Sequence, residues 1–240
     1  MILNDSGFIG RIKHHVLSKI VRFAYGNFTD VSHIMQNNYD LRGIDAIITT
    51  DGISYKATPE SILTVPQAIS EYNYSDIRKS DIVLDIGACC GGFALKAAKQ
   101  CRHVFAVEPI FHDQLIANIQ SNKIDNITVI KGMLGETGGT RSLIAFKGVE
   151  SKADVYTFSD LVELSGGSVD VLKCDIEGDE RFINATNLHG IRRIEMELHE
   201  AQSEWAVKLL AWLKEEYKTI DVNFDGTDMA LIHAFDRGEI

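Results

Sequence analysis

The sequence predicts an α/β fold, a doubly wound and mostly parallel seven-stranded sheet with an antiparallel C-terminal hairpin and a small N-terminal extension that holds a helix and a hairpin. From residue 81 onward, short apolar runs alternate with helix-like patterns, as in the repeated strand–helix units of a parallel sheet. The last two apolar runs, 217–224 and 229–235, are separated only by a short turn that contains Gly226, which favours an antiparallel pair. The length of 240 residues suits one large domain with an extension.

Short apolar runs bounded by polar or turn residues predict the other strands of the sheet. Residues 82–86 read as a buried parallel strand, and Pro109 ends the second strand. The predicted strands are 82–86, 104–108, 127–131, 169–175 and 191–199, with an extra strand from residue 143. The predicted helices are 93–100, 112–122, 157–164 and 204–216, where apolar residues recur at helical spacing.

The charge distribution divides the chain into residues 1–76, the N-terminal extension, and residues 77–240. Residues 1–80 hold 8 Lys and Arg and 8 Asp and Glu, so the whole net charge of -10 falls on the rest. Residues 8–24 form a basic amphipathic helix pattern. That helix is expected to dock on its own domain or on a second copy in a homo-oligomer, with contact to a membrane surface as the alternative.

The later part of the extension has its own local signals. Asp51 and Gly52 lie between two alternating runs and predict a hairpin. Thr58 followed by Pro59 is typical of a helix start, and we expect that helix to lead into the main domain.

Composition excludes several classes of protein. Hydrophobic residues make up 45% of the chain and charged residues 24%, which are globular averages. No apolar run is long enough for a membrane span, and the start lacks a signal-peptide pattern. The four cysteines, Cys89, Cys90, Cys101 and Cys174, show no zinc spacing, so we expect a cytoplasmic protein. The acidic balance argues against broad nucleic-acid binding.

The turn after residue 86 predicts a nucleoside site. Ligands of such sheets bind beyond the carboxyl ends of the strands. A dinucleotide fingerprint needs glycine at position 89, where this chain has Cys89. Gly87 and Gly91 still allow a tight turn beside a small ligand, and Asp85 could accept a hydrogen bond from an ammonium group. Glu108 ends the second strand, where a carboxylate can bind both ribose hydroxyls.

Three segments of the chain carry motifs: residues 83–93, residues 105–109 with their acidic Glu108, and residues 171–180, Val-Leu-Lys-Cys-Asp-Ile-Glu-Gly-Asp-Glu. The first two resemble the first and the acidic second motif of S-adenosylmethionine-dependent methyltransferases with a Rossmann-like fold. The third is similar to the most specific signature of the FkbM-type family within that class. Residues 157–161 and 194–199 fit the family's order, whereas Cys89, Cys90 and Cys174 depart from its usual residues.

The resemblance implies that residues 77–240 bind S-adenosylmethionine and transfer its methyl group. The residues expected to bind this cofactor are Asp85, Gly87, Ala88, Cys89, Gly91, Glu108, Pro109, Gly132, Met133 and Asp175. The implied reaction is O-methylation of a hydroxyl on a small-molecule, sugar or lipid-linked acceptor.

Asp175, Glu197 and His199 are the candidate catalytic residues because they lie at the ends of two strands expected to be neighbours. Three interpretations stay open. Asp175 or His199 acts as general base, the three bind a divalent metal, or the carboxylates are structural. The sequence does not favour the metal.

Two other functions remain as alternatives. An RNA methyltransferase has the same fold, and residues 118–122 resemble that class. The net charge and the lack of an Asn-Pro-Pro-Tyr-like tetrad after the fourth strand argue against it. A non-catalytic nucleoside-binding module is the second alternative.

Overall fold

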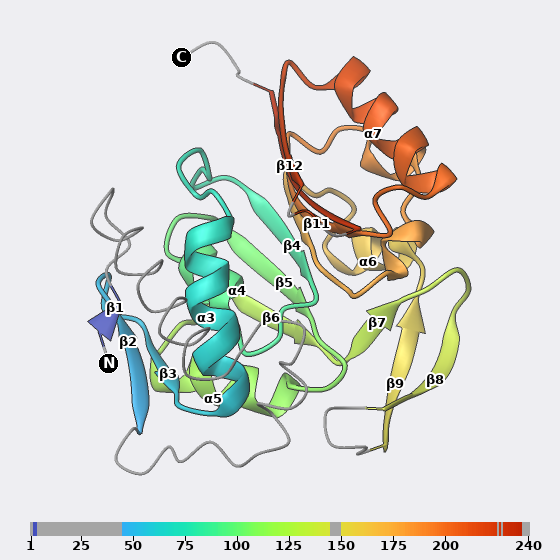
Figure 1. Cartoon of the computed structure of the whole chain (residues 1–240). Helices are drawn as coiled ribbons and strands as arrows, with labels where there is room; N and C mark the ends of the chain where they lie inside the picture. Colours follow the sequence, from blue (N-terminus) through green and yellow to red (C-terminus); the bar gives the residue numbers. More distant parts are fainter. Residues whose placement is uncertain (1, 4–44, 145–149, 225, 227, 237–240) are drawn as a thin grey trace.

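A seven-stranded mixed sheet forms the centre of the molecule in the computed structural model, which describes residues 2–3, 45–144, 150–224, 226 and 228–236 (Figure 1). The strand order is β12-β13-β11-β10-β4-β5-β6. Within this sheet of the described residues, β13 runs opposite to the other six strands, so the predicted fold class is confirmed. The strands are β4 (Ile82–Ile86), β5 (His103–Val107), β6 (Ile127–Ile130), β10 (Val171–Cys174), β11 (Arg193–His199), β12 (Thr219–Phe224) and β13 (Met229–Phe235).

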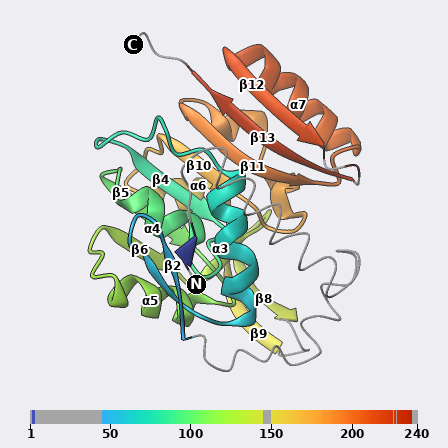
Figure 2. The same cartoon turned by 60° about the vertical axis from the view of Figure 1, so that its left-hand side comes forward.

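Helices cover both faces of this sheet (Figures 1 and 2). Alternate residues of β4 point to opposite faces, so Val83 joins one core and Leu84 the other. One core includes residues of α3 (Pro59–Glu71), α4 (Gly92–Ala98) and α5 (His112–Ser121). The other includes α6 (Phe158–Leu164), α7 (Glu204–Glu216) and the short 3-10 helices η3 (Asp179–Phe182) and η4 (Ala185–Leu188). In the described part of the chain, none of the helices has the length and apolar character needed to cross a bilayer.

A second sheet, absent from the sequence prediction except for one strand, branches from the end of β6. It has the order β7-β9-β8, with β7 (Gly132–Leu134), β8 (Gly139–Ile144) and β9 (Glu150–Tyr156). The extra strand expected from residue 143 begins instead at Gly139. Strand β9 escaped prediction because it carries charged residues such as Lys152 and Asp154 and has no apolar run.

The described part of the N-terminal extension packs into the core of the main domain. The hairpin of β2 (Ala46–Thr49) and β3 (Ser54–Lys56) is confirmed, as is the Thr58 cap of α3, whose side chain accepts a hydrogen bond from Ser61 N. A Cβ on Gly92 of α4 would lie 2.8 Å from the Cβ of Ala68, so α3 and α4 are in close contact. The predicted helix at 8–24 lies outside the described residues, and the division at residues 76 and 77 stays a prediction.

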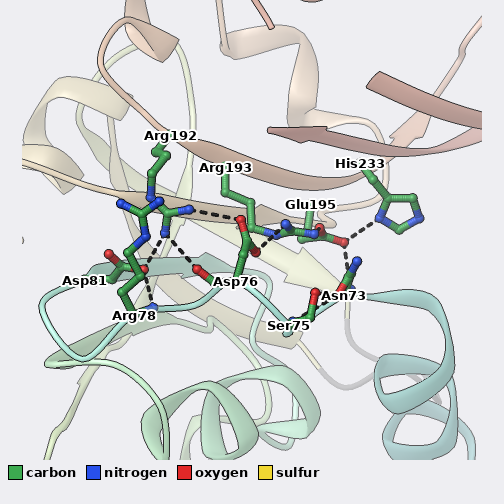
Figure 3. A network of polar contacts seen from close by, with 9 residues as sticks. All are labelled: Asn73, Ser75, Asp76, Arg78, Asp81, Arg192, Arg193, Glu195 and His233. Atoms are coloured by element: carbon green, nitrogen blue, oxygen red, sulfur yellow. Dashed lines mark hydrogen bonds and ion pairs between the residues drawn. The ribbon is translucent and has the colours of Figure 1, made fainter. Parts of the chain in front are cut away.

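A buried network of charges fastens the segment after α3 to the sheet (Figure 3). Arg193 is 1% exposed and forms ion pairs with Asp76 and with Glu195, which is fully buried. The carboxylate of Glu195 also accepts hydrogen bonds from the backbone N–H of Asn73 (3.0 Å) and from His233 Nδ1 (2.6 Å). The network therefore joins the segment that follows α3 to strands β11 and β13.

We expect Arg193→Met to lower the free energy of unfolding by about 3–5 kcal/mol, because it removes the guanidinium that pairs with the fully buried carboxylate of Glu195. Urea denaturation followed by circular dichroism measures this. Arg181→Met is the matched control, since Arg181 is half exposed and pairs with Asp179 at 3.4 Å; its cost should stay below about 1 kcal/mol. Equal losses in the two variants would contradict a structural role for the buried network.

Candidate functional site

The turn between β4 and α4 is held tightly against the neighbouring strands. The N–H groups of Gly87 and Ala88 both donate to the carbonyl of Val107, at 3.0 and 3.1 Å. Gly87 has φ +81°, and a Cβ at this position would lie 1.9 Å from the carbonyl oxygen of Asp175. The sequence interpretation gave Gly87 the task of leaving room for a ligand. The structure shows that the lack of a side chain at Gly87 makes room for the backbone of Asp175, directly after β10.

Glu108 links this turn to the loop that follows β5. The N–H of Cys89 donates to Oε2 of Glu108 at 2.7 Å. The other oxygen, Oε1, accepts from the N–H groups of Ile110 (2.6 Å) and Phe111 (2.9 Å). Cys89 reaches this position by adopting φ +49°, the left-handed backbone that a glycine would have supplied.

The carboxylate of Glu108 is held in place and retains acceptor capacity. A carboxylate has about four lone-pair sites, and these three bonds leave one on Oε2. Glu108 is only 4% exposed, so it lies at the predicted strand end as a fixed, nearly buried acceptor. That geometry fits a ligand hydroxyl that reaches Oε2.

Lys173 is a buried cation at the centre of the site, and sequence reasoning gave it no role. Its Nζ donates to the carbonyl of Gly87 at 2.7 Å and lies 3.3 Å from Oδ1 of Asp85 and 3.9 Å from Oδ2 of Asp175. Burial lowers the pKa of Lys173, but the charges of the two aspartates outweigh it and hold the pKa above the usual value. The group is therefore charged at neutral pH.

Asp85 lies beneath this cation and is fully buried. Neither of its carboxylate oxygens accepts a hydrogen bond within the described part of the chain. Burial raises its pKa, and the charge of Lys173 opposes that rise. The ammonium group beside Asp85 is that of Lys173, so the expected contact with a ligand ammonium stays a prediction.

Tyr72, from the segment after α3, adds a further wall that the sequence did not indicate. Its hydroxyl donates to Oδ2 of Asp175 at 3.1 Å, and its ring centre lies 5.5 Å from the Nζ of Lys173. Within α3, Gln67 Nε2 is 3.5 Å from Oε2 of Glu197. The lead-in helix and the residue that follows it therefore contribute side chains to the ends of β11 and β10.

His199 lies among three carboxylates. Its Nε2 is 3.4 Å from Glu177 and 3.9 Å from Glu197, and its Nδ1 is 3.3 Å from Glu180. Burial disfavours the charged ring, but the hydrogen bonds and charges of Glu177 and Glu180 outweigh burial and raise the pKa of His199 to about 11. A ring that is protonated at neutral pH has no free lone pair, so this arrangement speaks against His199 as the general base.

The remaining carboxylates of the site repel one another. Burial, together with the charges of Asp175 and Glu71, raises the pKa of Glu197 to about 8. Burial and the charge of Asp175 raise the pKa of Glu71 to about 7, although Gln67 and His233 oppose the rise. Burial also raises the pKa of Asp175. This end of the sheet therefore has more carboxyl groups than its cations balance, and Glu197 is mostly protonated at neutral pH.

The structure brings most of the predicted residues together. Asp85, Gly87, Ala88, Cys89, Gly91, Glu108, Pro109 and Asp175 lie in β4, β5 and β10 or in the turns at their carboxyl ends. Glu197 and His199 lie at the end of the neighbouring β11. Gly132 and Met133 belong to β7 instead, where a Cβ on Gly132 would lie 2.5 Å from the ring of Tyr156.

A surface hollow of about 640 Å³ lies beside α6 and is lined by Tyr156, Asp160, Glu163 and Leu164. None of the predicted site residues is among those lining it. Tyr156 covers Gly132, so the hollow borders the β7 strand and not the carboxyl ends of β4 and β10.

Comparison with known proteins gives distant relatives. No family model matches the chain. It is 26% identical over 193 residues to ribosomal protein L11 methyltransferase of Clostridium perfringens, covering 78% of this chain and 53% of that protein. The chain thus spans about half the length of the curated relatives it matches. The predicted membership of the FkbM-type family stays a prediction.

Solved structures align over most of the chain with low similarity. Trm5b from Pyrococcus abyssi has a TM-score of 0.47 and 15% identity, over 81% of this chain and 57% of that one. An rRNA methylase from Streptococcus thermophilus has a TM-score of 0.46 and 9% identity, over 67% of this chain and 90% of that one. Sp1610 from Streptococcus pneumoniae, solved with S-adenosyl-L-methionine, has a TM-score of 0.43 and 12% identity, over 74% of each chain.

Gly87→Ala should lower the free energy of unfolding by ~3 kcal/mol or more, because the new Cβ collides with the backbone of β10. Gly52→Ala is the matched control. Gly52 has φ +84° but nothing within 4 Å of an added Cβ, so it should cost only the left-handed strain of ~1–2 kcal/mol. Thermal unfolding of both variants checks this. A Gly87→Ala protein as stable as the Gly52→Ala protein would refute the close approach.

Proposed function

We propose that the chain is an S-adenosylmethionine-dependent methyltransferase that methylates a hydroxyl on a small-molecule, sugar or lipid-linked acceptor. The observation that carries the proposal is the fixed Glu108 carboxylate, bound by the N–H of Cys89 and by two N–H groups of the next loop. A carboxylate at the end of the second strand, beside a glycine-containing turn, suits a ribose. The curated relatives, named as methyltransferases, support the same reaction class.

The cofactor would supply an electrophilic methyl group on a sulfonium. Glu108 would bind ribose through the free acceptor position of Oε2, and the turn at Gly87 would place the ligand above β4. Asp175 would accept the proton that the acceptor hydroxyl loses as its oxygen attacks the methyl carbon and the carbon–sulfur bond breaks. Tyr72 orients Asp175 through its 3.1 Å hydrogen bond. Positioning of this kind is the main contribution a protein makes to such a displacement.

A second acceptor class is an amine on a ribosomal protein. The curated relatives are named for ribosomal protein L11, and the carboxylates Glu71, Glu177 and Glu197 would favour a cationic acceptor. RNA is less suited to this end of the sheet because phosphates would meet those carboxylates.

Glu108→Ala should weaken S-adenosylmethionine binding by ~1.5–3 kcal/mol, the usual loss for a hydrogen bond to a charged group. Isothermal titration calorimetry measures it, and thermal unfolding confirms that the variant remains folded. Asp113→Ala is the matched control, because the Asp113 side chain is 91% exposed and pairs with His112 at 3.0 Å; the affinity of this variant should match that of the unmodified protein. Unchanged affinity in Glu108→Ala would remove Glu108 from the binding site.

The proposed activity is tested with radiolabelled methyl donor and three acceptor sets: hydroxylated small molecules and sugars, ribosomal protein L11, and total RNA. Label on a hydroxyl acceptor supports the first proposal, and label on the ribosomal protein supports the second. Label on RNA alone would overturn both. No binding of the donor by calorimetry would overturn the methyltransferase assignment itself.

A further inference from the structure

Three side chains at the ends of β10 and β11 form a compact set of metal-type donors. Asp175, Glu177 and His199 each offer one ligand atom, and these atoms all lie within 4.8 Å of one another. His199 ends β11, and Asp175 and Glu177 lie in the loop that follows the adjacent parallel strand β10. The sequence interpretation of a metal site used Glu197 in place of Glu177. Glu197 lies farther from the ring, with its Oε1 3.9 Å from Nε2 of His199, against 3.4 Å for Glu177.

A second feature fixes the histidine from behind. Glu180 is fully buried, and its oxygens accept hydrogen bonds from the N–H groups of Ile176 (2.8 Å) and Gly178 (3.0 Å). The same carboxylate faces Nδ1 of His199 at 3.3 Å. Histidines that ligate metals almost always donate their other ring N–H to a carboxylate or carbonyl in this way. The outer nitrogen, Nε2, is thereby directed toward Glu177 and the open side of the cluster.

The open side is accessible to a ligand. The side chain of Glu177 is 87% exposed, whereas that of His199 is 15% exposed. Tyr72 holds Oδ2 of Asp175 from the α3 side, so the cluster has a rigid inner wall and a free outer face. Three protein donors with an open outer face are the arrangement of a metal site that also binds a substrate.

We propose that Asp175, Glu177 and His199 bind one divalent cation, with Glu180 as the residue that positions His199. A ligand set of two carboxylates and one imidazole suits Mn²⁺ or Zn²⁺ better than it suits an ion that prefers oxygen ligands alone. With the cation bound, Asp175 would serve as its ligand and not as the general base. The cation would polarise an acceptor oxygen and lower its pKa, so that the acceptor proton is lost to solvent. Cation binding also releases the proton of His199, because only the neutral ring is a ligand. The salt bridge of His199 with Glu177 is the form of the site without the cation.

The test measures Mn²⁺ binding to the whole chain by isothermal titration calorimetry, without methyl donor or acceptor. The expected result is one Mn²⁺ per chain and a rise in the melting temperature, since a ligand that binds only the folded state stabilises it. Glu177→Gln should weaken binding at least tenfold, and because the side chain is exposed this variant should fold. Glu180→Gln should weaken it by roughly 10–100-fold through the loss of His199 orientation.

Glu200→Gln is the matched control, because Glu200 follows His199 directly in the chain and belongs to no donor set of the described residues; its Mn²⁺ affinity should be unchanged. Zn²⁺ is titrated in parallel and should depend on the same residues. The proposal is overturned if neither cation binds up to about 1 mM, the weak limit of physiological cation sites, or if Glu177→Gln binds as tightly as Glu200→Gln. Binding of the methyl donor is measured in a separate titration. Absence of cation binding would therefore overturn the cation site alone, and the donor titration decides the proposed methyltransferase function.

Discussion

The buried ammonium of Lys173 is the interaction on which the arrangement of the site depends. It bonds the carbonyl of Gly87 in the first turn, lies beside Asp85 under that turn and faces Asp175 at the end of the next strand. In the sheet, Lys173 is paired with Asp85 on one side and with Glu195 on the other, and Glu195 is paired with His233. A row of ionisable residues thus crosses four strands on one face. Within it Lys173 pairs with Asp85 and His233 pairs with Glu195. Removing one partner of a buried ion pair costs far more than the pair contributes.

This row also explains why the segment after α3 belongs to the site. Buried charged groups need polar partners, and this segment supplies them. Tyr72 bonds Asp175. The N–H of Asn73 bonds Glu195, and Asp76 pairs with Arg193 (Figure 3). Tyr72 and Tyr74 both pack against Phe93 from α4, at distances between ring centres of 5.7 and 5.0 Å. The same contacts that bury the charges therefore fix Tyr72 beside the predicted catalytic carboxylate.

Much of this fold could be predicted because local sequence decides it. Apolar runs gave the strands of the main sheet, and Thr58 and Gly52 gave a cap and a turn that depend on neighbouring residues only. The strand-end rule also placed Asp85, Glu108, Asp175 and His199 correctly at one edge. The features that the sequence did not reveal depend on contacts between residues that lie far apart in the chain. Lys173 is a charged residue inside an apolar run, and only the register with β4 shows that Asp85 compensates it. Tyr72 is separated from Asp175 by 103 residues, so no local pattern links them. The role of Glu180 likewise depends on its position behind His199.

The charge balance at the end of the sheet gives the remaining constraint. On the β10 side, Lys173 is shared between two aspartates, and on the β11 side His199 is shared among Glu177, Glu180 and Glu197. Glu71 adds a further carboxylate whose charge raises the pKa of Glu197. Two cations therefore face six carboxylates. Apolar packing does not cover all of the surplus carboxylates, since the side chain of Glu177 is exposed. Carboxylates crowded in this way are stabilised when a cation arrives, whether it is a divalent ion or the positive centre of a bound molecule. The end of the sheet thus prefers positively charged ligands on electrostatic grounds alone, and a sulfonium donor, an ammonium acceptor and a metal ion all share that property.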